Sequence, residues 1–155
     1  MSKVRFFTPE NRLGEAIAEA GGKLVDTAIA DADEQIALAA PETLQKIDDM
    51  LDQISQLAAR GADNTQLQKL YDVVREVAGL AGLAGLPDLG MAAHTFCSQI
   101  DLALHKGALT EEQMQVNLGS LRLLRQPDRF SLAERQGLLD NLHAVLDKAH
   151  KTAAT

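Results

Sequence analysis

Apolar residues recur at every third or fourth position along most of this 155-residue chain. The clearest series is Leu44, Ile47, Leu51, Ile54 and Leu57, which would lie on one face of an α-helix. No segment alternates apolar and polar residues as a half-buried strand does. Aromatic residues make up only 3% of the sequence, which disfavours a β-sandwich. We therefore expect an all-α protein, an antiparallel four-helix bundle with a sizeable core in one compact domain.

An additional helical arm is predicted before the bundle, over residues 1–40. Thr8–Glu10 combines a capping hydroxyl, a proline at the first helical position and an acid in the first turn, which predicts a helix start. The arm is either one helix as far as Ala39 or two helices separated at Gly21–Gly22. Its apolar face would permit a homodimer or would cover the bundle, and it consists of Leu13, Ile17, Leu24 and Ala28.

The bundle itself is predicted over residues 41–150. Pro41 should open its first helix, and Arg60–Gly61 should end that helix, because a cation followed by glycine is a common helix stop. The other boundaries are indicated by Asp63 or Asn64, Gly85–Pro87, Lys106–Gly107, and two capping boxes, Thr110 with Gln113 and Ser131 with Glu134. The last helix should turn inward Leu132, Leu139, Leu142 and Leu146.

The overall charge and composition restrict the partners. The net charge is −7, whereas binding to nucleic acid needs a basic surface, so nucleic acid is not an expected partner. No apolar run approaches the ~18 residues of a membrane span, and the first residues lack the apolar segment of a signal peptide. The single cysteine, Cys97, excludes an internal disulfide and fits a reducing cytoplasm. We expect a cytoplasmic protein that does not enter membranes.

The segment VVREVAGLAGLAGLPDLG, Val73–Gly90, places several glycines inside a helical pattern. A glycine in mid-helix costs about 0.5–1 kcal/mol relative to alanine. Arg75, Gly79 and Gly82 stand at i, i+4 and i+7, so they share one helix face. The glycines could let two helices of the bundle pack closely, or they could keep a surface bare for a partner. The segment lacks the glycine patterns of phosphate-binding loops.

This segment resembles the signature of the histidine phosphotransfer (HPt) domains of bacterial phosphorelays. That signature is a histidine on a bundle helix, a Lys or Arg three residues later and a glycine at the fourth. A small residue follows two positions on, and then a Leu-Gly-like turn leads into the next helix. Here Gly79 matches the glycine, Ala81 the small residue and Gly85–Leu86 the turn, and Asp101 stands where the family often has an acid. The resemblance extends over about residues 41–106.

Two positions depart from the HPt signature. Arg75 occupies the place of the phosphorylated histidine, and Ala78 that of the basic residue. Phosphotransfer needs a neutral imidazole nitrogen, whereas a guanidinium stays protonated. The resemblance therefore implies an HPt-like fold and docking face with no enzymatic activity and no cofactor. Its partner-binding residues would be Arg75, Ala78, Gly79 and Gly82, and its partner a receiver domain or a histidine kinase in two-component signalling.

Two alternatives stay open. His94 could be a displaced phosphoacceptor, which would make the chain an active phosphotransferase. The chain could instead be an adaptor or structural bundle unrelated to phosphorelays, in which the glycines serve core packing. Exposure of Gly79 and Gly82 below a projecting Arg75 would favour docking, and burial of these residues against another helix would favour packing.

The remaining candidate residues suggest no further chemistry. His94 and Asp101 are about 10 Å apart along a helix, too far for one ion, and Asp101 with His105 supplies only two ligands, so no metal site is expected. Cys97 should be a small core or flank residue. Positive charge gathers around Pro127, either as a solvated helix end or as a secondary patch for an acidic partner. The residues concerned are Arg122, Arg125, Arg129 and Arg135.

Overall fold

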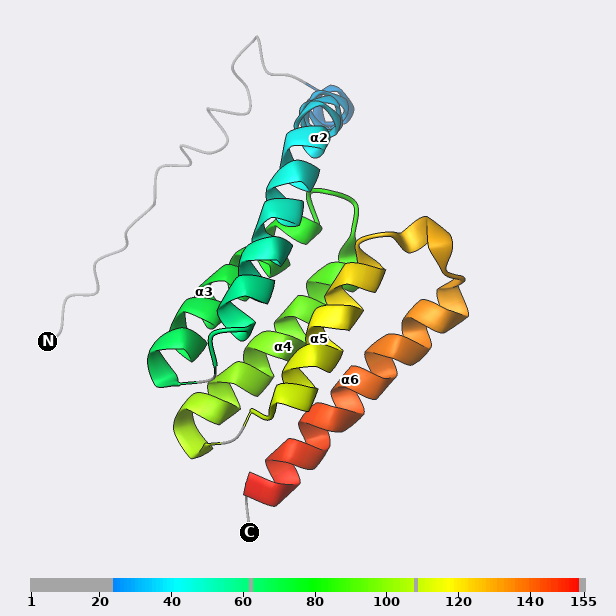
Figure 1. Ribbon diagram of the computed structural model, residues 1–155. Coiled ribbons are helices and arrows are strands. Elements are labelled where there is room, and N and C mark those ends of the chain that lie inside the picture. The colour runs from blue at the N-terminus through cyan, green and yellow to red at the C-terminus, as the bar shows by residue number, and fades with distance from the viewer. Residues whose placement is uncertain (1–23, 62, 108, 154–155) are drawn as a thin grey trace, which may run out of the picture. The chain divides into compact units, whose positions relative to one another are not determined.

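The computed structural model describes residues 24–61, 63–107 and 109–153, and these form helices without a strand. The elements are α2 (Val25–Ala58), α3 (Asn64–Ala81), α4 (Pro87–Lys106), α5 (Glu111–Leu124), the short 3-10 helix η1 (Pro127–Arg129) and α6 (Leu132–Ala153) (Figure 1). The all-α prediction is confirmed. The predicted helix start at Thr8–Glu10 and the break at Gly21–Gly22 lie outside the described residues, as do Leu13 and Ile17.

The chain divides into two compact units, Met1–Gln35 and Ile36–Thr155. The described part of the first unit consists of Leu24 and the first turns of α2, and its large apolar side chains, Leu24, Val25 and Ile29, are exposed. The second unit holds the hydrophobic core and all the residues discussed below. No helix among the described residues is long and apolar enough to cross a membrane.

Pro41 lies inside α2 and does not begin a helix, so the predicted boundary there is wrong. A proline in a helix interior removes one N–H donor and costs about 3 kcal/mol. Pro41 is exposed, so water can hydrate the carbonyl group left without its donor. The flanking residues are mostly alanine and other good helix formers, and they favour continuation of the helix.

Consecutive helices of the second unit pack antiparallel, whereas α4 and α6 run parallel (Figure 1). Asp88 pairs with Arg135 near the start of both helices. Farther along each helix, Thr95 Oγ1 lies 3.2 Å from His143 Nε2. The later contact on α4 is thus also the later contact on α6, so the two helices run in the same direction and the C-terminal turns of α6 lie beside those of α4.

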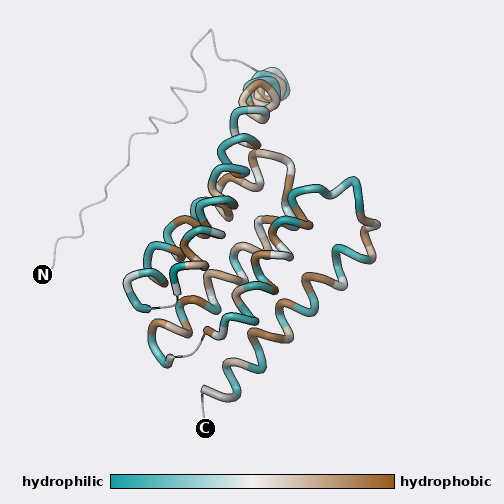
Figure 2. Tube along the Cα trace, in the orientation of Figure 1, coloured by the Kyte–Doolittle hydropathy of each residue, from teal (hydrophilic) through white to brown (hydrophobic). Residues whose placement is uncertain are grey.

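The core is formed by the apolar faces of the five α-helices that the structure describes. Figure 2 shows apolar and polar residues alternating turn by turn along the helices, as the spacing of the sequence predicted. The largest fully buried side chains include Phe96, Ile47, Ile54, Leu70, Leu89, Ile100, Leu121, Leu124, Leu139 and Leu142. Leu132, predicted to point inward, is 69% exposed, because it is the first residue of α6 and burial begins only in later turns.

The helix boundaries follow the predicted capping residues. Asp63 accepts a hydrogen bond from the Gln66 backbone at 2.9 Å and caps α3. Thr110 and Gln113 form a complete capping box at the start of α5. Ser131 forms the corresponding contacts with Glu134 before α6. The Ser131 hydroxyl and backbone N–H donate to the Glu134 carboxylate at 2.7 and 2.8 Å, and these two bonds lower the pKa of the Glu134 carboxyl group, since they favour its charged form.

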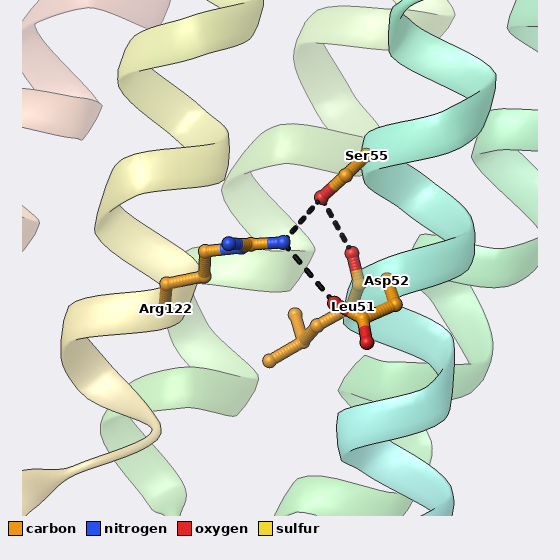
Figure 3. A network of polar contacts seen from close by, with 4 residues as sticks. All are labelled: Leu51, Asp52, Ser55 and Arg122. Carbon is orange, nitrogen blue, oxygen red and sulfur yellow. Dashed lines mark hydrogen bonds and ion pairs between the residues drawn. The ribbon is translucent and has the colours of Figure 1, made fainter.

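Arginines of α5 attach this helix to acidic residues of α2. Arg125 donates two hydrogen bonds to Asp48, at 2.8 and 2.9 Å. Arg122 donates to Asp52 at 3.1 Å and to Ser55 at 2.9 Å (Figure 3). Ser55 in turn donates to the Leu51 carbonyl at 2.8 Å (Figure 3). Three of the four arginines near Pro127 are thus paired with acidic residues of other helices, namely Arg122, Arg125 and Arg135.

We expect Arg125→Gln to lower the free energy of unfolding by about 1–3 kcal/mol, because it removes two charge-assisted bonds from a half-buried carboxylate. Arg129→Gln is the matched control. Arg129 is exposed and donates only to Gln126 in the same short segment, so its loss should stay within about 0.5 kcal/mol. Urea unfolding of both variants measures the difference, and equal losses would contradict the assigned role of the Arg125–Asp48 pair.

Candidate functional site

The glycine face of α3 is open. Arg75, Gly79 and Gly82 are exposed, and Ala78 is half-buried. A Cβ atom added at Gly79 or Gly82 would meet no atom within 4 Å. Arg75 forms no ion pair or hydrogen bond with any residue that the structure describes. Within the described part of the chain, these two glycines therefore do not serve close packing between helices.

Three other small residues make the close contact between α3 and α4. A Cβ atom at Gly90 would lie 3.4 Å from Ala81 Cβ and 3.6 Å from the Ala78 carbonyl oxygen. The turn between the helices is closed by Gly85, which adopts a φ of +71°, and by a 2.8 Å hydrogen bond from the Leu86 N–H to the Ala81 carbonyl. The tight turn and the small residues fix the register of the two helices.

This register opens a hollow of about 450 Å³ on the surface of the second unit. Helix α3 contributes Tyr71 and Arg75, α4 contributes His94, Cys97 and Asp101, and α6 contributes His150. His94 stands four positions after Gly90, one helical turn farther along α4, and lines the same cavity as Arg75. The sequence singled out Arg75 and His94 separately but gave no sign that they share a cavity with His150.

The Cys97 thiol lines the same hollow as Arg75 and is affected by its charge. Burial raises the pKa of Cys97 from 9.0 to about 11, and the charge of Arg75 acts against this rise. Arg75 and Cys97 line the same hollow, so the Arg75 side chain faces the α4 residues there. Cys97 is 6% exposed and holds its proton at neutral pH, so it is a core residue and not a nucleophile.

Asp101 and His105 form a local pair near the C-terminal end of α4. His105 Nδ1 lies 3.5 Å from Asp101 Oδ1 and 2.8 Å from the Asp101 carbonyl oxygen. Among the described residues, no group of three His, Cys, Asp or Glu side chains is arranged to hold a metal ion. Asp101 is thus a carboxylate at the rim of the hollow with an imidazole beside it.

A buried amide pair joins α4 to α5 and was not foreseen from the sequence. Asn117 donates to Gln99 Oε1 at 2.8 Å and to the Gln113 carbonyl at 2.7 Å. Gln99 Nε2 and Asn117 Oδ1 have no hydrogen-bond partner among the described atoms. Gln99 also lines a second hollow of about 460 Å³, near Lys106 and Lys148. A polar residue on an otherwise apolar helix face was the available signal for this pair.

Comparison with known proteins gives no further guide to the site. The sequence matches no protein-family model, and neither the curated proteins nor the solved structures yield a significant match.

We expect Gly79→Ala and Gly82→Ala to leave the protein equally stable or up to about 1 kcal/mol more stable, because alanine favours the helix and its methyl group meets open space. Gly85→Ala is the contrasting variant. Its positive φ should cost about 1–2 kcal/mol. Thermal and urea unfolding of the three variants test this, and a clear loss of stability in both Gly79→Ala and Gly82→Ala would return these residues to a packing role.

We expect Arg75→Gln to raise the pKa of Cys97 further, because it removes the charge that opposes the effect of burial. Native-state alkylation by iodoacetamide should become slower, whereas Arg75→Lys should keep a rate near that of the wild type. The ordinary pKa of 9.0 lies below the folded value of about 11, so the unfolded chain loses the thiol proton first. The protonated Cys97 thiol therefore favours the folded state fully below pH 9.0, and this contribution is lost as the pH rises from 9.0 through about 11. Equal alkylation rates in Arg75→Gln and wild type would place Arg75 away from the hollow.

Proposed function

We propose that this chain is a non-catalytic HPt-like signalling protein of the cytoplasm, which binds a receiver domain or a histidine kinase and modulates a phosphorelay. Its fold would be a four-helix HPt-like bundle with an N-terminal helical arm. The observation that carries the proposal is the open face of α3, where Gly79 and Gly82 leave space beside the exposed Arg75. Ala78 and these three residues form the proposed docking face.

The open face favours docking over internal packing for an energetic reason. Gly79 lies inside α3 and costs about 0.5–1 kcal/mol there, and no neighbouring helix offsets this cost by approaching it. A partner helix could approach the bare backbone closely and bury it. The cost would then be offset in the complex and not in the free chain.

Arg75 suits the role of an anchor and not that of a phosphoacceptor. It is exposed, carries a permanent charge, and makes no ion pair among the described residues. Receiver domains present clustered carboxylates, and a guanidinium can bind a carboxylate through two parallel hydrogen bonds. A pair of this kind, desolvated at the centre of an interface, is typical of a binding hot spot.

An active phosphotransferase is the second candidate, and the position of His94 favours it. His94 is exposed on α4 and lines the same hollow as Arg75. An imidazole in that position could receive a phosphoryl group from a partner docked on α3. The two candidates share a docking face and differ in whether a covalent phosphohistidine forms.

Binding to receiver domains tests the proposal directly. Receiver domains and kinase domains encoded in the same genome would be screened against the immobilised chain by interferometry. We expect at least one to bind, and we expect Arg75→Ala to weaken that binding by about 2 kcal/mol, roughly 30-fold. Gly79→Ala should also weaken binding. Gly119→Ala on α5 is the matched control, because Gly119 is also an exposed helical glycine with open space around it.

Two results would contradict the proposal. Binding that is unchanged in Arg75→Ala and Gly79→Ala would place the interface elsewhere. Acid-labile phosphate transferred to the wild-type chain and lost in His94→Ala would establish the active transferase instead.

A further inference from the structure

The hollow between α3, α4 and α6 gathers hydrogen-bond donors that nothing in the described structure uses. Tyr71, Arg75, His94 and His150 line it, and none of the four forms a hydrogen bond or ion pair with another described residue. The hydroxyl, guanidinium and imidazole groups are all donors. Arginines elsewhere in the bundle show the contrast, because Arg122, Arg125 and Arg135 are all paired with acids.

The donors reach the hollow from three different helices. Arg75 arrives from α3 because the contact of Ala78 and Ala81 with Gly90 sets the register. His94 lies on α4. His150 arrives from α6 because that helix runs parallel to α4. Donors that surround a space from several sides suit a tetrahedral group with several acceptor oxygens. A planar carboxylate, by contrast, is bound by the two parallel N–H groups of a single guanidinium.

The charge around the hollow favours an anion. The chain as a whole carries a net charge of −7 and repels anions at long range, so any anion site must be local. Arg75 supplies a permanent positive charge, and two imidazoles stand close by. The lining also holds one carboxylate, Asp101, whose Oδ1 lies 3.5 Å from His105 Nδ1.

We propose that this hollow binds a phosphoryl group, with Arg75 as the charged anchor and His94 and His150 as flanking donors. Resting on the function proposed above, the group is the aspartyl phosphate of a docked receiver domain. The chain then binds the phosphorylated receiver in preference to the unphosphorylated one. The step is binding only: no bond to phosphorus forms or breaks.

The phosphoryl site can be tested on the isolated chain without any partner. Inorganic phosphate is titrated at constant ionic strength, held with chloride, and the ring signals of the histidines are followed by NMR. We expect saturable shifts for His94 and His150. His143, whose ring lies beside Thr95 outside the hollow, is the internal control and should not shift. Shifts that rise linearly with phosphate concentration without saturating, or that are equal for all histidines, would overturn the proposed site.

Substitutions then assign the site to its residues. Arg75→Gln should weaken phosphate binding about tenfold or more, the loss expected for one charge-assisted contact. His94→Gln and His150→Gln should weaken it less. Arg129→Gln should have no effect, because Arg129 is an exposed arginine far along the chain from the hollow. The replaced side chains are exposed, and thermal melts confirm that each variant is folded. Equal phosphate affinity in Arg75→Gln and Arg129→Gln would refute the role of Arg75.

A binding experiment with a receiver domain distinguishes the phosphoryl site from the docking function on which it rests. A receiver that binds the chain is compared with and without beryllofluoride, which mimics the aspartyl phosphate. We expect about tenfold tighter binding of the activated form, and loss of that difference in Arg75→Gln. Equal binding of both forms would leave the docking function standing and overturn this inference. Phosphate binding without any receiver partner would support the site and count against the docking function. Phosphohistidine at His94 would overturn the binding-only role.

Discussion

The close contact between α3 and α4 determines where the candidate-site residues on these two helices lie. A Cβ atom at Gly90 would contact Ala81 Cβ at 3.4 Å and the Ala78 carbonyl oxygen at 3.6 Å, and the Gly85 turn holds the two helices in that register. Because the helices run antiparallel from this point, Arg75 comes level with His94 and Cys97.

The rest of the second unit holds this pair of helices in place through polar contacts at its edges. Arg125 binds Asp48 and thereby joins α5 to α2, while Arg135 binds Asp88 and joins α6 to α4. The second pair matters for the hollow, because it sets the parallel register that carries His150 to the side of α4. Arg125 and Arg135 thus join and align helices within the chain.

Local signals in the sequence predicted local structure well. The caps at Asp63, Thr110 and Ser131 were readable because each depends on residues only three positions apart. Pro41 made the prediction wrong, because the favourable residues on both sides of it continue the helix despite the proline's cost of about 3 kcal/mol.

Contacts between distant segments could not be read from the sequence. The partners of Arg122 and Arg125 lie on a helix far away in the chain, and no local pattern identifies them. The same holds for the hollow: the α3 face with Arg75, Gly79 and Gly82 followed from helical spacing, whereas the approach of His150 depends on the packing of α6. Sequence therefore indicated one wall of the candidate site, and the tertiary structure supplied the other two.

Mapping of a bound receiver domain by NMR tests the central claim, that the bare face of α3 is where a partner docks. Glycine amides give separate signals, and the chain carries them on both the docking face and the opposite helices. The account predicts that the amides of Gly79 and Gly82 shift or broaden when the receiver is added, while those of Gly119 on α5 and Gly137 on α6 stay unchanged. Shifts at Gly119 and Gly137 with none at Gly79 and Gly82 would contradict it.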